Sequence, residues 1–81
     1  MSARITVYTS PQCAQCWATE RALRTAGVDF ETVDLATTPE AVESLRELGH
    51  KQAPVVIDRV NGIDWSGFRP GLISQLEAVT A

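Results

Sequence analysis

The chain has 81 residues, which is enough for one domain, because two halves would each be too small to bury a core. Its composition, 44% hydrophobic and 21% charged, is typical of a folded soluble protein and excludes a disordered tail. The net charge is −3 and the seven basic residues are scattered, which argues against nucleic acid, because phosphate binding needs a basic cluster. Because no apolar run approaches the roughly 20 residues that span a bilayer and no signal peptide is recognisable, we expect a cytoplasmic protein without membrane contact.

The first part of the chain predicts strand, helix and strand. Residues 4–9, "RITVYT", alternate apolar with polar or aromatic side chains and are rich in β-branched residues, which is typical of a strand. A helix is predicted over residues 13–26 and ended by Gly27. Residues 28–35, "VDFETVDL", predict a second strand, parallel to the first through a right-handed crossover.

A second helix is predicted in "ATTPEAVESLRELG", residues 36–49. Its start has two interpretations: Thr37 and Glu40 form a capping box, or Thr38 caps the helix with Pro39 at its first position. The apolar spacing predicts a buried stripe, and Gly49 ends the helix. The stripe comprises Val42, Leu45 and Leu48.

A β-hairpin and a last helix complete the chain. The apolar run Val55–Ile57 predicts a strand covered on both faces. The pair Asn61-Gly62 predicts a type I′ turn, in which both central residues have positive φ. Residues 70–79 predict a helix, which gives the order βαβαββα for a single domain over 1–81. The inward side chains of this helix are Leu72, Ile73, Leu76 and Val79.

Cys13 and Cys16 are the two cysteines of the chain and form a Cys-x-x-Cys motif. In a reducing compartment such a pair is catalytic or metal-binding more often than a permanent crosslink. With the lone His50 they cannot complete a tetrahedral zinc site within one chain, so no metal is expected, although a cluster bridged between two chains remains an alternative.

Helix geometry separates the two thiols. Cys13 falls on the polar arc of the predicted helix, whereas Cys16 falls at the edge of the arc that faces the sheet. Cys13 also lies at the helix N-terminus, where unpaired N–H groups and the dipole favour a thiolate and lower a cysteine pKa. We therefore expect Cys13 to attack a partner's disulfide and Cys16 to resolve the mixed disulfide. The alternative is a cysteine pair without a role.

Trp17 follows Cys16 on the polar arc and has two interpretations. Its ring lies over Arg21 or Arg24 in a cation–π contact, or it forms an aromatic platform where a partner docks.

A Cys-x-x-Cys after the first strand, and a single proline before a later one in "QAPVVI", together resemble the thioredoxin fold. This resemblance implies an α/β domain with a four-stranded mixed sheet, helices on both faces, and Pro54 as a cis-proline at the active site. The segments "WSGFRP", "CAQC" and "QAPVV" resemble the NrdH-redoxins, and the likeness covers nearly the whole chain.

In that family the redoxin is a protein-disulfide reductase that binds no cofactor, and we expect this chain to be a monomer. It takes electrons from thioredoxin reductase and passes them to the large subunit of class Ib ribonucleotide reductase, so that NADPH is used only indirectly. Cys13 would then be the attacking thiol, Cys16 the resolving thiol and Pro54 the cis-proline.

The resemblance further implies that a loop at the edge of the active site contacts partners. We expect a mainly structural role for Trp65, a mixed one for Phe68 and Arg69, and apolar surface near the disulfide from Trp17, Pro54, Trp65 and Phe68. The loop comprises Trp65, Ser66, Gly67, Phe68 and Arg69.

Two positions depart from the family pattern. Ser10 stands where many relatives have a lysine or arginine, which removes one electrostatic source of a lowered Cys13 pKa, and Gly71 stands where an acid is usual.

The alternative function is a glutathione-dependent glutaredoxin, but Ser10, "APV" and "WSGF" represent its carboxylate-binding groups poorly. A redox sensor or cluster carrier without turnover is a further alternative.

Overall fold

The computed structural model describes residues 4–80, with side chains described up to Leu76. The elements follow the predicted order βαβαββα. They are β1 (Ile5–Thr9), α1 (Ala14–Thr25), β2 (Phe30–Asp34), α2 (Pro39–Glu47), β3 (Val55–Asp58), β4 (Ile63–Ser66) and α3 (Pro70–Thr80).

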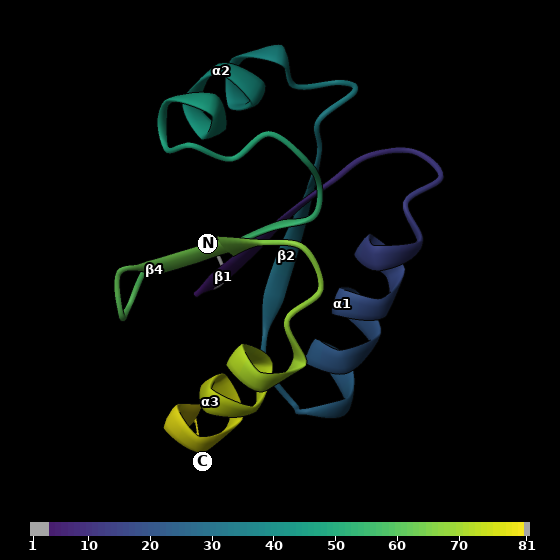
Figure 1. Cartoon of the computed structure of the whole chain (residues 1–81). Helices are drawn as coiled ribbons and strands as arrows, with labels where there is room; N and C mark the ends of the chain where they lie inside the picture. Colours follow the sequence, from purple (N-terminus) through teal and green to yellow (C-terminus); the bar gives the residue numbers. More distant parts are fainter. Residues whose placement is uncertain (1–3, 81) are drawn as a thin grey trace.

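The four strands form one mixed sheet in the order β2-β1-β3-β4. β1 and β2 are parallel, whereas β3 is antiparallel to both of its neighbours. α2 lies on one side of the sheet, and α1 and α3 lie on the other (Figure 1). The predicted fold class is therefore confirmed.

The main core fills the space between the sheet and the pair α1 and α3. It forms because successive strand residues point to opposite faces, so that Ile5 and Val7 face these helices while Thr6 and Tyr8 face the other way. Leu45 is buried on the α2 side. The buried members of the main core are Ile5, Val7, Leu23, Val28, Val56, Trp65, Ile73 and Leu76.

The pairing of β1 with β3 places two sequence motifs at one edge of the sheet. Tyr8 pairs with Val55, so the end of β1 lies beside the start of β3. The segment that follows β1 carries the cysteines, and Pro54 directly precedes β3. The loop between β3 and β4 lies at the opposite edge, where Ile5 pairs with Asp58.

Two expectations for α2 were wrong. Thr38 is the N-cap residue with Pro39 at the first helical position, as in the second interpretation, but its side chain makes no capping hydrogen bond. The Thr37 hydroxyl, which the capping box would place at the helix start, instead donates to the Asp34 carbonyl at 3.1 Å. The capping box is therefore absent from the described residues. Leu48 is 58% exposed, because the helix ends at Glu47 and the chain turns away after Leu45 has packed.

The predicted type I′ turn was also wrong. β3 ends at Asp58 and β4 begins at Ile63, which leaves a four-residue loop in place of a two-residue one. Gly62 has φ +68° and donates its N–H to the Asp58 carbonyl at 2.9 Å, whereas Asn61 does not have positive φ. The Asp58 carboxylate accepts the N–H groups of Val60 and Asn61, and these bonds stabilise the wider loop.

The other expected side-chain positions hold in part. Ile57 is only half-buried, so β3 is less enclosed than its apolar run indicated. Ile73 and Leu76 are buried, and Leu72 packs against the core. The side chain of Val79 lies outside the described residues.

Candidate active site

Cys13 and Cys16 form a disulfide whose Cα atoms are 5.2 Å apart. Cys13 is the N-cap residue of α1, and its Sγ accepts the backbone N–H of Cys16 at 3.1 Å. Gln12, directly before it, has φ 56°, an uncommon value for a residue other than glycine. The turn therefore presents the Cys13 sulfur to the positive end of α1, where negative charge is favoured.

The two sulfur-bearing residues differ in access to solvent. Cys16 is 1% exposed, whereas Cys13 is half-buried. Cys13 is therefore the more accessible of the two, which is the difference in exposure that helix geometry predicted.

Pro54 lies at the same edge of the sheet as the cysteine turn. The Ala53–Pro54 peptide bond is cis, and the Pro54 side chain is buried. Its carbonyl accepts the N–H of Gly67 at 2.8 Å. This bond ties the loop after β4 to the start of β3.

The predicted partner-binding loop divides into a buried and an exposed part. Trp65 is 5% exposed in the main core, and its indole N–H has no partner among the described residues. Ser66 ends β4, and Gly67 is buried with φ +84°. Phe68 is 39% exposed. Arg69 is exposed, and its carbonyl accepts the N–H groups that begin α3.

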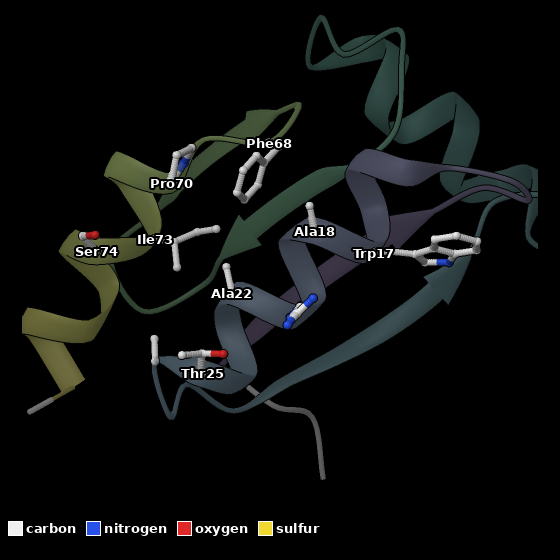
Figure 2. Close-up of a pocket in the computed structure, with 10 residues that line it drawn as sticks. Trp17, Ala18, Ala22, Thr25, Phe68, Pro70, Ile73 and Ser74 are labelled. Atoms are coloured by element: carbon white, nitrogen blue, oxygen red, sulfur yellow. The ribbon is translucent and has the colours of Figure 1, made fainter.

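An apolar groove of about 590 Å³ runs between α1 and α3. Figure 2 shows Ala18 and Ala22 on one side and Phe68, Pro70 and Ile73 on the other. The small alanine side chains of α1 keep the groove open.

Trp17 lies at the margin of this groove with 69% of its surface exposed, and its ring extends away from Phe68 (Figure 2). The cation–π contact found among the described residues joins Arg24 to Phe30, so it does not involve Trp17. Because Pro54 and Trp65 are buried, the apolar surface expected from four residues comes from Trp17 and Phe68.

A second cavity, of about 530 Å³, lies on the α2 side and brings Ser10 together with Arg46, His50 and Lys51. The sequence analysis did not identify Arg46 and Lys51 as neighbours of Ser10. Arg46 pairs with Glu43 at 3.4 Å, and the ring of His50 contacts the Asp64 carboxylate. Lys51 has no ion pair within the described part of the chain. Sequence spacing from Ser10 could not have revealed these side chains. Ser10 follows β1, whereas Arg46 lies in α2 and Lys51 lies in the segment after α2.

Gln15 is a second residue that the sequence analysis missed. It lies between the cysteines, and its Oε1 accepts the N–H of Phe68 at 3.3 Å. The only signal in the sequence was its place inside the motif "CAQC".

The described residues also bear on metal and membrane binding. Among their side chains, no group of three or more His, Cys, Asp or Glu is placed to hold a metal ion. None of the helices in the described part of the chain has the length and apolar character needed to cross a membrane.

Comparisons with known proteins agree with this geometry. The sequence model of the glutaredoxin family matches residues 5–62. The glutaredoxin-like protein NrdH of Escherichia coli K12 is 49% identical over 73 residues, 90% of this chain and 88% of the relative. NrdH of Lactococcus lactis IL1403 is 32% identical over 89% of this chain and 97% of the relative.

Solved structures show the same likeness. The structure of NrdH-redoxin from Escherichia coli, described as having a thioredoxin-like activity profile, is 50% identical and superposes with a TM-score of 0.83 over 90% of this chain and 93% of that one. The glutaredoxin of Archaeoglobus fulgidus, at 22% identity and a TM-score of 0.77 over 91% of this chain and 85% of that one, shares the fold. With its cysteine pair the chain is a thiol–disulfide oxidoreductase, and it belongs to the NrdH proteins of the glutaredoxin family.

Proposed function

We propose that this protein carries electrons in the cytoplasm from thioredoxin reductase to the large subunit of a class Ib ribonucleotide reductase. NADPH is the ultimate donor and is used only by the reductase. The name of the relatives supports the link to ribonucleotide reduction, and the thioredoxin-like activity profile of the Escherichia coli protein supports the choice of reductant.

The proposed chemistry is two successive thiol–disulfide exchanges. The Cys13 thiolate attacks one sulfur of the partner's disulfide, the partner's S–S bond breaks, and its other sulfur leaves and takes up a proton. The Cys16 thiolate then attacks the Cys13 sulfur and releases the partner's second thiolate. Two electrons have moved to the partner, and the Cys13–Cys16 disulfide has formed. Thioredoxin reductase reverses this state by attacking Cys13, the more accessible sulfur.

The observation that carries the choice of reductant is the apolar groove beside the cysteine turn. The backbone N–H of Trp17 donates to the Cys13 carbonyl at 3.2 Å, and the backbone N–H of Phe68 donates to Gln15 Oε1, so the backbones of both exposed aromatic residues are tied to the turn. An exposed apolar surface of this kind suits a protein partner, because burying it is favourable on association. A small charged thiol gains little from it.

The decisive experiment compares two reducing systems on the same oxidised protein. NADPH with thioredoxin reductase should reduce Cys13–Cys16 efficiently, and glutathione with glutathione reductase should do so slowly, both followed by loss of NADPH absorbance. Transfer to the class Ib large subunit is then measured as deoxyribonucleotide formed per NADPH. Equal or faster turnover with glutathione would contradict the proposal.

One observation favours the alternative of a glutathione-dependent glutaredoxin. Lys51 and Arg46 line the cavity next to Ser10 and offer cations that could meet the carboxylates of glutathione. A Lys51→Gln variant separates the two functions. It should leave turnover with thioredoxin reductase unchanged, whereas under the alternative it should weaken turnover with glutathione.

A further inference from the structure

Gln15 joins the cysteine turn to the loop between β4 and α3 across 53 positions of sequence. Its side-chain oxygen accepts the Phe68 N–H at 3.3 Å. Gly67 lies beside the same oxygen, since a Cβ built on Gly67 would be 3.6 Å from it. The Gln15 side chain therefore rests against the backbone of this loop.

The loop is held on both sides of Phe68 by backbone bonds. Before it, Gly67 donates to the Pro54 carbonyl at 2.8 Å. After it, the Arg69 carbonyl accepts the N–H groups of Leu72 and Ile73, at 3.1 and 3.2 Å, and so starts α3. Phe68 lies between these anchors, and its own backbone N–H is linked to the cysteine turn by the hydrogen bond that it donates to Gln15 Oε1.

Core packing does not explain the identity of residue 15. Gln15 is exposed on the first turn of α1, and it contributes nothing to the buried cluster. What its amide oxygen does is fix the backbone of Phe68, whose ring lines the apolar groove. The hydrogen bond thus links the backbone of a groove residue to a residue two positions after Cys13.

We propose that Gln15 is a positioning residue that determines how well protein partners dock. By holding the Phe68 loop in place relative to Cys13, it lowers the ordering cost of forming the complex, because the loop is already in its bound position. Small disulfides do not contact the groove and are unaffected. This inference rests on the proposed function, because it assigns the groove to the protein partners of the same cysteine pair.

The test uses two variants of Gln15 and a matched control. Gln15→Met keeps the length of the side chain but removes the oxygen acceptor, whereas Gln15→Glu keeps an acceptor for the Phe68 N–H. Gln75→Met makes the same chemical change at an exposed position of α3. All three are measured as oxidised substrates of thioredoxin reductase and, after chemical reduction, as reductants of insulin and of hydroxyethyl disulfide.

Gln15→Met should raise the KM for thioredoxin reductase by about two- to tenfold, the effect of one hydrogen bond, with kcat unchanged. The rate with insulin should fall by a similar factor, and the rate with hydroxyethyl disulfide and the thermal midpoint should stay at the wild-type values. Gln15→Glu should restore the KM, and the amide resonance of Phe68 should shift in the Met variant alone. Gln75→Met should match the wild type throughout.

Three outcomes overturn the inference. The first is a wild-type KM and insulin rate for Gln15→Met. The second is an equal loss of the rate with hydroxyethyl disulfide in Gln15→Met, which would place the effect on the sulfur chemistry. The third is a KM for Gln15→Glu that stays as high as that of Gln15→Met. Failure of the proposed function looks different, because the wild type itself would then not be reduced by thioredoxin reductase. The insulin arm, which needs no reductase, still decides the role of Gln15 in that case.

Discussion

Arg4 and Asp58 form a bidentate ion pair at the edge of the sheet opposite the cysteines. Arg4 Nε donates to Asp58 Oδ1 at 3.1 Å and Nη2 donates to Oδ2 at 2.9 Å. The Asp58 side chain is fully buried, and it also accepts bonds from Asn61 and Val60. This carboxylate therefore joins β3, the hairpin loop and the residue that precedes β1.

The first prediction concerns acid stability. The hydrogen bonds from Arg4, aided by those from Asn61 and Val60, lower the pKa of Asp58 from 3.8 to about 2, against the opposing effect of burial. A carboxyl group whose pKa is lower in the folded state stabilises that state fully at pH values above its pKa in the unfolded chain. This contribution is lost as the pH falls through the pKa of the folded state. About 2 kcal/mol of unfolding free energy should therefore disappear between about pH 4 and pH 2.

Asp58→Asn tests this in urea unfolding at a series of pH values. The variant should lose about 3 kcal/mol at neutral pH, because it leaves a part-buried Arg4 without its partner, and its stability should change less between pH 4 and pH 2. Asp29→Asn is the control, because Asp29 is exposed and this change should preserve the wild-type profile. An Asp58→Asn profile that keeps the wild-type slope would contradict the assignment.

The second prediction separates the roles of the cysteines. Because Cys13 is accessible and Cys16 is buried, Cys16→Ser should attack a partner and stop as a mixed disulfide, whereas Cys13→Ser should form no adduct. Adducts with thioredoxin reductase or the class Ib large subunit are identified on non-reducing gels and by mass spectrometry. Trapping by the Cys13 variant alone would reverse the two roles.

The sequence predicted the elements of this fold because local patterns dominate them. The alternation of Ile5 and Val7, the stop at Gly27 and the spacing of Ile73 and Leu76 depend on neighbours within a few residues. The difference in solvent exposure between Cys13 and Cys16 also followed from helix geometry alone. The resemblance to NrdH-redoxins added what geometry could not, namely which partners to propose.

The misses arise where distant residues decide the local structure. Asn61-Gly62 favours a two-residue turn, but Arg4, from the other end of the chain, holds the buried Asp58 carboxylate, which accepts two loop N–H groups and stabilises a wider loop. The bond between Gln15 and the Phe68 backbone joins positions that no periodicity relates. Lys51 reaches the cavity beside Ser10 only because β3 returns to the end of β1.

The third prediction compares two glycines. Gly67 has φ +84°, a conformation in which an alanine costs about 1–2 kcal/mol, even though its Cβ would meet Gln15 Oε1 only at an ordinary 3.6 Å. Gly67→Ala should therefore lower the free energy of unfolding by that amount. Gly71→Ala should raise it by about 0.5–1 kcal/mol, because Gly71 lies in α3 with open space around it. Chemical denaturation measures both, and the same sign for the two variants would refute the backbone argument.

The last prediction assigns the apolar groove to the reductase. Phe68 is 39% exposed, so a partner that covers the groove buries only the remaining part of the ring, and Phe68→Ala should cost about 1 kcal/mol of binding. That loss corresponds to an increase of about fivefold in the KM for thioredoxin reductase. The kcat should be unchanged, because the sulfur atoms are not altered.

Val60→Ala is the matched control, because Val60 is 68% exposed but lies in the hairpin loop at the far edge of the sheet. It removes a comparable exposed apolar side chain and should leave the KM at the wild-type value. Steady-state NADPH oxidation at several concentrations of each oxidised variant gives the two constants. If Val60→Ala raises the KM as much as Phe68→Ala does, the reductase does not dock on the groove between α1 and α3, and exposed apolar area in general would explain the loss.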